Sequence, residues 1–379
     1  MKIHLHNFGG YEFAFQLSSL LQESGMKVIH TFSDQYKENR DPGSTQADIT
    51  TTIGIKTIFK LKKYNIFRRS LFEIEFGLRL RSLHNRIGSD ILIVSTAPLI
   101  VSLILVFGNR SKIIFWHQDI YSTGMALELR KLGPVGTILS KFFTNLEVRI
   151  LNRADVIVSI SKDFGTFYRA HLISPNKVLY HQNWAPTRKV DQLNNATILE
   201  GAPLKLLYSG TIGRKHPVGL LQELSVALRN LGVDFSLDIY TSGAVEFHDP
   251  NVKIAPPLEY QKYLEELKAS NVGLVILNDD ASRYSFPSKI YTYLATSIPL
   301  VVFAAPGTFI WNVVEEAGGQ IFEPNSAGVI DASNFLESLD SKRVEEMKNR
   351  SQIFSETNFS ETKQLWFWKP LIQNLSRIE

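Results

Sequence analysis

A chain of 379 residues has room for about two domains, and its 44% hydrophobic and 21% charged residues are typical of a globular protein. The sequence contains no cysteine, which excludes disulfide bonds, thiolate metal sites and thiol nucleophiles. Its formal net charge is only +4, and the first residues, MKIHLHNFGG, lack the long apolar core of a secretory signal, so we expect a cytoplasmic protein.

The first half of the sequence alternates short apolar runs with longer segments of helical spacing, which predicts a parallel sheet covered by helices. Residues 11–24 carry apolar side chains at every third or fourth position, up to Gly25, and predict the first helix. The predicted strands of this half are 2–6, 27–31, 91–94, 112–116, 155–159 and 177–181.

Gly9 and Gly10 lie between the first strand and the first helix, and Tyr11 and Glu12 follow them. Glycines at a helix start let the backbone approach a ligand and point its amide groups toward it. The pair lacks the third glycine of a dinucleotide-binding loop, so we expect no NAD site. The two remaining interpretations are a loop that contacts a ligand and an ordinary tight turn.

Positive charge is concentrated in 56–86, which holds nine Lys and Arg residues against Glu73 and Glu75. Apolar residues such as Ile58 and Phe59 are interleaved with these charges, so 56–72 suits contact with an anionic membrane surface. The alternative is a solvated helix whose apolar side belongs to the core. We expect no nucleic-acid binding, because no recognition module accompanies the charges.

The apolar run 91–107 approaches the length of a membrane span. Pro98 interrupts this run, proline is tolerated in the first turn of a helix, and Ser95 or Thr96 can cap a helix that begins there. A buried strand, a turn and a buried helix therefore fit the run better than a span does.

A group of polar residues, His117, Gln118, Asp119 and Tyr121, follows the strand 112–116. A histidine at this place is suited to orient a hydroxyl group or to accept its proton at neutral pH. A structural histidine and a helix-capping aspartate are the alternatives.

Residues 184–203 are polar and contain prolines, which predicts a linker between two domains. A second alternating series follows, and two α/β halves joined by a hinge place a ligand cleft between the carboxyl ends of both sheets. The predicted strands are 204–208, 235–240, 272–277 and 300–303, and the predicted helices are 218–231, 260–269, 289–296 and 362–378.

Gly210 and Gly213 follow the first strand of this second half, with Thr211 between them and Arg214 and Lys215 directly after them. Two glycines with adjacent cations suit a diphosphate group. A surface turn with incidental cations is the alternative.

Pro287, Ser288 and Lys289 begin a later helix, with Ser288 as its expected N-cap. The free amide groups of the helix start and the Lys289 cation would together form a third anion site.

The run that begins with these residues, PSKIYTYLATSIPLV, resembles the donor-domain stretch of family-4 GT-B glycosyltransferases, above all those that assemble bacterial O-antigens and exopolysaccharides. Other segments resemble this family in the same order along nearly the whole chain. They are GGYEFAFQLSSLLQESGMKV for its first helix, RADVIVSISKDF for its end-of-domain strand, Asn183–Trp184 for its linker entry, LYSGTIGRK for its diphosphate loop and AGGQIFEP for its late strand.

The resemblance implies a GT-B fold, with two facing Rossmann-like domains around a cleft and a C-terminal helix that returns to the first domain. It implies an acceptor-binding domain in 1–183, a linker in 184–203, a nucleotide-sugar-binding domain in 204–361 and the returning helix in 362–379. The implied reaction is transfer of a sugar, with retention, from a nucleotide diphosphate sugar to a saccharide acceptor. A polyprenyl-linked acceptor would place the protein on the inner face of the cytoplasmic membrane and would explain the basic 56–72 segment.

The resemblance also assigns roles to residues, and it implies neither a metal nor another cofactor, because cations and helix amides would stabilise the departing diphosphate. The catalytic roles fall to Asp119, His117, Arg214 and Lys215. The donor contacts fall to Gly210, Thr211, Gly213, Arg214, Lys215, Pro287, Ser288, Lys289 and Thr292. The acceptor contacts fall to Gly9, Gly10, Tyr11, Glu12 and Tyr121.

Three positions depart from the family pattern. Thr292 stands where a glutamate usually holds the ribose hydroxyls, Tyr284 where its partner glutamate is expected, and His216 where a lysine is usual. A charged hydrogen bond is worth about 1.5–3 kcal/mol, so its loss weakens nucleotide binding or activity. The alternatives are therefore a non-catalytic subunit that partners an active transferase, and a nucleotide-sugar epimerase with the same fold.

Overall fold

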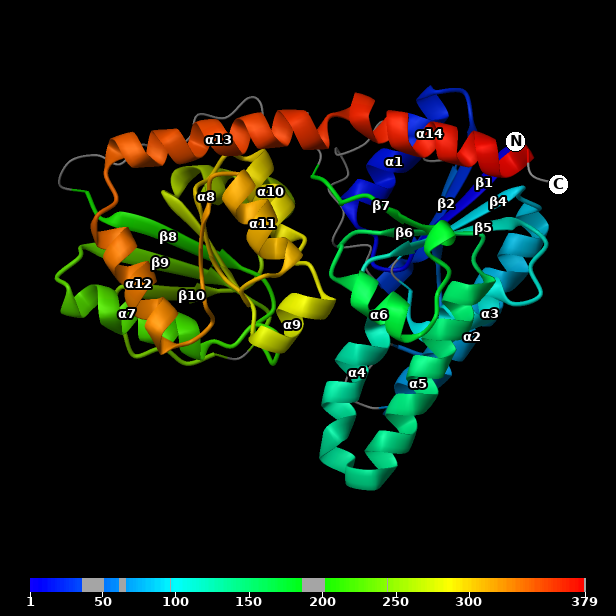
Figure 1. Cartoon of the computed structure of the whole chain (residues 1–379), viewed down its shortest axis with the longest axis horizontal. Coiled ribbons are helices and arrows are strands. Elements are labelled where there is room, and N and C mark those ends of the chain that lie inside the picture. Colours follow the sequence, from blue (N-terminus) through cyan, green and yellow to red (C-terminus); the bar gives the residue numbers. More distant parts are fainter. Residues whose placement is uncertain (36–50, 61–65, 96, 186–201, 244, 378–379) are drawn as a thin grey trace. The chain divides into compact units, whose positions relative to one another are not determined.

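The computed structural model describes residues 1–35, 51–60, 66–95, 97–185, 202–243 and 245–377 (Figure 1). The chain divides into two compact units: unit 1 comprises Met1–Gln182 and Glu361–Glu379, and unit 2 comprises Asn183–Ser360. The expected boundaries at 183 and 362 each differ by one residue from these. Most of the expected linker, residues 186–201, lies outside the described residues.

Unit 1 is a seven-stranded parallel sheet in the order β3-β2-β1-β4-β5-β6-β7. Its strands are β1 Lys2–Asn7, β2 Lys27–Ser33, β3 Thr52–Ile55, β4 Ile91–Ser95, β5 Lys112–His117, β6 Val156–Ser159 and β7 Val178–Tyr180. Its helices are α1 Glu12–Glu23, α2 Ile66–Ile87, α3 Leu99–Val106, α4 Tyr121–Leu129, α5 Gly133–Arg153, α6 Phe164–Ala170 and α14 Glu361–Arg377. The six strands predicted for this half are confirmed, and β3 is an additional edge strand.

The apolar run 91–107 forms the buried strand β4 and the helix α3, as predicted. The expected cap is wrong for Ser95, which is the last residue of β4, while Pro98 occupies the N-cap position; Thr96 lies outside the described residues. Among the described residues, no helix is both long and apolar enough to cross a membrane.

Unit 2 is a six-stranded parallel sheet in the order β10-β9-β8-β11-β12-β13. Its strands are β8 Leu204–Ser209, β9 Phe235–Tyr240, β10 Val252–Ala255, β11 Val272–Ile276, β12 Leu300–Phe303 and β13 Gln320–Phe322. Its helices are α7 Gly219–Asn230, α8 Tyr260–Ala269, α9 Asp279–Tyr284, α10 Lys289–Ala295, α11 Phe309–Glu316, α12 Ser326–Glu337 and α13 Ser341–Phe359.

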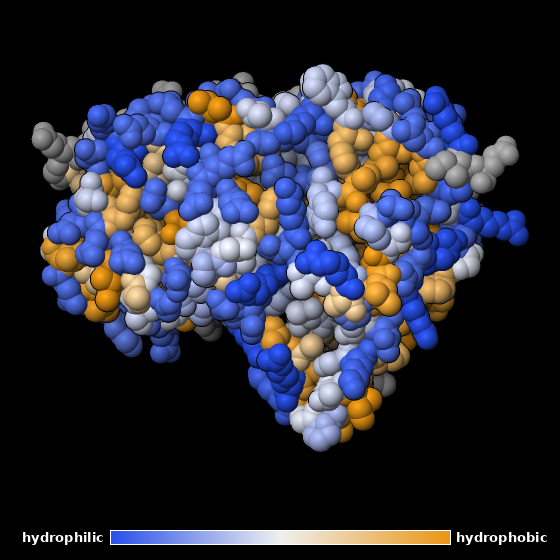
Figure 2. All heavy atoms as spheres, viewed as in Figure 1, coloured by the Kyte–Doolittle hydropathy of each residue, from blue (hydrophilic) through white to orange (hydrophobic). Residues whose placement is uncertain are grey.

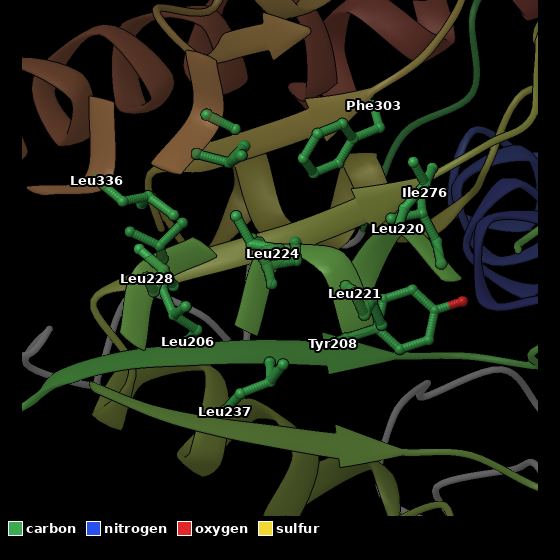
Figure 3. Packing of buried hydrophobic residues seen from close by; sticks show 14 of the residues in the cluster. Leu206, Tyr208, Leu220, Leu221, Leu224, Leu228, Leu237, Ile276, Phe303 and Leu336 are labelled. Carbon is green, nitrogen blue, oxygen red and sulfur yellow. The ribbon is translucent and has the colours of Figure 1, made fainter. Parts of the chain in front are cut away.

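The core of unit 2 supports the end of β8, where the expected diphosphate loop begins. Leucines of α7, including Leu221, Leu224 and Leu228, pack with side chains of the central strands (Figure 3). Tyr208, the penultimate residue of β8, belongs to the same cluster and is fully buried. The loop after β8 therefore starts from a rigid base.

Helix α14 belongs to unit 1, although it follows unit 2 in the sequence. Trp368 is fully buried, and its ring centroid lies 4.7 Å from that of Trp116 on β5. The His181 ring stacks on Phe367 at 3.9 Å between centroids, and its Nε2 atom lies 2.7 Å from Oε1 of Gln364. Burial lowers the pKa of His181 to about 4, so this ring is neutral at physiological pH.

Candidate functional site

The loop after β8 requires glycine at position 210. Gly210 has φ of +140°, a region that residues with side chains rarely adopt. A β-carbon here would lie 2.6 Å from Nζ of Lys289 and 3.1 Å from its Cε. The absence of a side chain thus lets the Lys289 ammonium reach the backbone of the loop.

Lys289, the first residue of α10, places a buried cation beside this loop. Its Nζ atom has no hydrogen-bond partner among the described residues and lies 4.0 Å from the centroid of the Tyr208 ring. Burial lowers the pKa of Lys289 to about 7. A desolvated amine without a counter-ion favours binding of an anion, because the anion would offset the cost of keeping it charged.

Asn278 connects the same loop to helix α9. Its Nδ2 group donates a hydrogen bond of 2.7 Å to the carbonyl oxygen of Arg214, and its backbone N–H donates to that of Lys215 at 3.0 Å. Its Oδ1 atom accepts from the backbone N–H of Ala281 and caps α9. The only sequence signal for Asn278 is that an asparagine before two aspartates is typical of a helix N-cap.

Lys215 is held beside Tyr284, the residue that stands where a glutamate was expected. The Lys215 Nζ atom lies 5.0 Å from the centroid of the buried Tyr284 ring and donates a hydrogen bond of 3.3 Å to Oγ of Ser285. An aromatic face attracts an ammonium group without neutralising its charge. Tyr284 therefore positions this cation, while the side chain of Arg214 is exposed.

His216 does not add charge to this loop. Its Nδ1–H donates to the carbonyl oxygen of Ile276 at 2.7 Å, and its backbone forms a bridge with Gly213. Burial first, and then the neighbouring Lys289 and Lys215, lower the pKa of His216 to about 4. The ring is neutral at physiological pH, so Arg214, Lys215 and Lys289 supply the positive charge.

Gly9 and Gly10 form a tight turn between β1 and α1 of unit 1. Gly10 has φ of +64°, and a β-carbon on Gly9 would lie 2.6 Å from the ring of Tyr11. The side-chain oxygen of Asn7 accepts a hydrogen bond of 2.7 Å from the backbone N–H of Tyr11. The exposed Tyr11 ring stacks on the Phe13 ring, with 5.5 Å between their centroids. The turn presents Tyr11 and Glu12 at the start of α1, while the glycines serve the turn's geometry.

The geometry around His117 favours the structural alternative over proton transfer. The ring is buried, with Nδ1 at 2.7 Å from the hydroxyl of Tyr168 and Nε2 at 3.3 Å from Oε1 of Glu147. Both ring nitrogens are thus engaged within unit 1, and a proton-accepting role for His117 stays a prediction. Asp119, two residues further on, is half-buried just after β5.

Glu147 of α5 is a residue that sequence reasoning missed. Its carboxylate accepts hydrogen bonds from the backbone N–H groups of Tyr121 and Ser122, at 2.8 and 2.9 Å, and from the Ser122 hydroxyl. It therefore caps α4 while it holds His117. Its partners lie about 25 residues or more away, too far for a local pattern to reveal.

Replacing Glu147 by glutamine should lower the free energy of unfolding by about 1–3 kcal/mol, because one oxygen that accepts hydrogen bonds becomes a donor. Urea denaturation followed by circular dichroism measures the change, and the exposed Glu337→Gln on α12 is the matched control. Equal stability of the two variants would contradict the capping role.

No protein-family model matches the chain. A protein described as a probable glycosyltransferase, WbjE of Pseudomonas aeruginosa, is 21% identical over 275 residues, which are 67% of this chain and 65% of that protein. The chain thus matches slightly less than two thirds of the length of this curated relative.

Solved structures resemble nearly the whole chain. A sucrose-phosphate synthase from Thermosynechococcus elongatus matches with a TM-score of 0.71 and 13% identity over 99% of each chain. A glycosyltransferase from Rickettsia africae matches with a TM-score of 0.66 and 12% identity over 100% of this chain and 99% of that one. An α-glucosyltransferase in complex with UDP matches with a TM-score of 0.64 and 13% identity over 100% of both chains. The chain has the GT-B fold.

Within this GT-B fold, the start of α10 differs in detail from the prediction. Ser288 occupies the N-cap position, but its backbone is helical, with φ of −59° and ψ of −25°, and its side chain makes no capping hydrogen bond. Pro287 is buried, whereas Ser288 is exposed and Thr292, one turn later, is half-buried. Thr211 is exposed, and its carbonyl oxygen accepts from the Tyr208 hydroxyl at 3.4 Å.

The basic segment of unit 1, 56–72, is divided between exposed and buried residues. Lys56, Ile58, Phe59 and Lys60 are exposed, whereas Phe72 is fully buried. Arg69 pairs with Glu73 at 2.7 Å and donates to the hydroxyl of Tyr121. Residues 61–65 lie outside the described residues. Within the described part of this segment, Arg69 is half-buried in its ion pair with Glu73 and Phe72 is fully buried, so these two residues do not form an exposed face.

Proposed function

We propose that this protein is a glycosyltransferase that moves a sugar from a nucleotide diphosphate sugar to a saccharide acceptor. The observation that carries the proposal is the Lys289 ammonium, buried without a hydrogen-bond partner among the described residues beside Gly210 at the carboxyl end of β8. In a parallel α/β sheet, ligands bind at this end of the strands. Similarity to WbjE and the bound UDP in a structural neighbour support a nucleotide-sugar donor.

Three cations of unit 2 would stabilise the leaving group. When the bond between the anomeric carbon and the diphosphate oxygen breaks, negative charge grows on that oxygen, and Lys289, Lys215 and Arg214 would offset it. The acceptor hydroxyl then forms the new bond to the anomeric carbon and gives its proton to the departing diphosphate oxygen. We propose that this transfer retains the anomeric configuration and needs no metal, and that Asp119 is the acidic residue of the acceptor half.

We further propose a lipid-linked saccharide acceptor and a role in assembly of a bacterial surface polysaccharide. The likeness of the sequence to O-antigen and exopolysaccharide glycosyltransferases supports this assignment. A polyprenyl-linked acceptor is confined to a membrane, so the protein would work at the cytoplasmic surface of that membrane.

A thermal-shift screen tests the donor site. UDP, GDP, CDP and dTDP, alone and with their common sugars, are added with and without chelator. One nucleotide should raise the melting temperature, chelator should leave the shift unchanged, and Arg214→Ala should reduce it. A shift that disappears with chelator would contradict the metal-free site.

Two other functions have specific observations in their favour. A structural neighbour described as a UDP-N-acetylglucosamine 2-epimerase, from Listeria monocytogenes, matches with a TM-score of 0.61 and 13% identity. Tyr284 and Thr292 in place of glutamates favour a catalytically impaired subunit. Acceptor-dependent release of nucleotide supports transfer, free epimerised nucleotide sugar supports the epimerase, and no turnover with intact nucleotide binding supports the subunit.

A further inference from the structure

Helices α4 and α5, joined by the single turn Arg130–Leu132, form a hairpin that projects from the body of unit 1 (Figure 1). The two helices pack against each other, and Leu129 of α4 and Leu146 of α5 are buried. A β-carbon on Gly136 would lie 1.9 Å from the carbonyl oxygen of Leu129, so the chain approaches itself closely at the turn. The hairpin is therefore shaped by its own inner contacts.

A second apolar face of this hairpin is exposed. The side chains of Leu132, Val135, Ile138 and Phe142 are 49%, 60%, 69% and 54% exposed. The last three are spaced by three and four residues, so they line one side of α5. Figure 2 shows hydrophobic atoms along one edge of the projection. Soluble proteins rarely expose large contiguous apolar patches, and such patches often mark interaction sites.

The charges beside this face indicate what it contacts. Arg130, Lys131 and Lys141 are exposed, and residues 129–146 contain no aspartate or glutamate. Cations next to exposed apolar side chains complement anionic lipid, since the apolar groups enter the acyl boundary and the cations meet the phosphates. A second copy of the chain is a poorer partner, because two such faces would bring like charges together.

We propose that the tip of the hairpin, residues 130–142, docks unit 1 on the surface of an anionic lipid bilayer. This surface contact is independent of the proposed sugar transfer and of the nucleotide site in unit 2. It also differs from the membrane contact that the sequence predicted in 56–72, where Arg69 is half-buried and Phe72 is fully buried.

Vesicle flotation with the full chain tests the docking. The probes are vesicles of phosphatidylcholine alone and of phosphatidylcholine mixed with phosphatidylglycerol, at low and high salt. The double variant Ile138→Ser/Phe142→Ser removes apolar contact, and Arg130→Gln/Lys131→Gln/Lys141→Gln removes charge. Ile353→Ser on α13 is the matched control, since Ile353 is 64% exposed in unit 2. Melting temperatures show whether each variant remains folded.

The wild-type protein should float with the anionic vesicles at low salt and be released at high salt. The apolar double variant should bind at least tenfold more weakly, and the charge variant about 100-fold more weakly, because each cation near an anionic surface contributes about fivefold. Ile353→Ser, and Ile58→Ser in the 56–72 segment, should bind like the wild type.

Several results would overturn the proposal. These are no flotation of the wild-type protein, equal binding to vesicles of phosphatidylcholine alone, or undiminished binding of the folded double variant. Light scattering provides a further test, because a wild-type dimer that becomes a monomer in the double variant would make this face a contact between copies.

Discussion

Lys289→Met should bind nucleoside diphosphate about 10- to 100-fold more weakly than the wild-type protein, which corresponds to loss of one charged hydrogen bond. Methionine keeps most of the side-chain volume and removes the amine that lies unpaired at Gly210. Isothermal titration with the nucleotide found in the thermal-shift screen measures the change. Lys253→Met is the control, because Lys253 is exposed on β10.

The same residue should link nucleotide binding to proton uptake. Burial lowers the pKa of Lys289 to about 7, so the amine is mostly neutral in the ligand-free protein at about pH 9. A bound diphosphate favours the ammonium form, so binding at this pH should take up close to one proton, whereas at about pH 6 the amine is already charged. Titrations in buffers of different ionisation enthalpy measure this uptake.

The free energy of unfolding of the ligand-free protein should also depend on pH through Lys289. The pKa of Lys289 is lower in the folded protein than the value of 10.5 in the unfolded chain. Between about pH 7 and pH 10.5, the unfolded chain therefore binds more protons than the folded protein. The contribution of Lys289 to the free energy of unfolding therefore rises with pH across this window. Lys289→Met should remove both this dependence and the proton uptake, and an unchanged nucleotide affinity in the variant would contradict the assigned anion site.

Trp368→Ala should lower the free energy of unfolding by about 3–5 kcal/mol, the usual cost of truncating a fully buried tryptophan. Trp368 is fully buried against Trp116, whereas Trp366, two residues earlier on α14, is 76% exposed. Trp366→Ala is therefore a matched control and should change stability by less than about 1 kcal/mol.

Urea denaturation gives the free energies, and amide hydrogen exchange locates the effect. Exchange should rise in β5, which carries Trp116, and should stay unchanged in the sheet of unit 2. A loss in Trp368→Ala as small as that expected for Trp366→Ala would show that the buried face of α14 contributes little to the stability of unit 1.

The fold was accessible from the sequence because its strands are short apolar runs between turn residues. Strands such as Ile91–Ser95 and Leu300–Phe303 are fully buried in parallel sheets, so they are nearly continuous apolar runs in the sequence. The edge strand Thr52–Ile55 was missed, because four residues that include Gly54 and are mostly half-buried give no such signal.

The candidate site was predicted as separate motifs of the sequence, whereas several of its contacts could not be predicted. Gly210 and Lys289 were identified separately, and the structure brings them together at the end of β8. The parts played by Asn278 and Glu147 depend on partners far away in the sequence, which no spacing rule connects. The engagement of both His117 nitrogens depends on Tyr168 and Glu147 for the same reason.

The return of α14 to unit 1 also imposes an order on biosynthesis. Residues 1–182 leave the ribosome first, but the surface around Trp116 and His181 stays uncovered until residues 361–377 are made. The whole of unit 2 is synthesised in the interval. The nascent chain thus carries an incomplete first domain through nearly half of its translation, and a chain that stops before α14 would leave this aromatic surface open to chaperones and proteases.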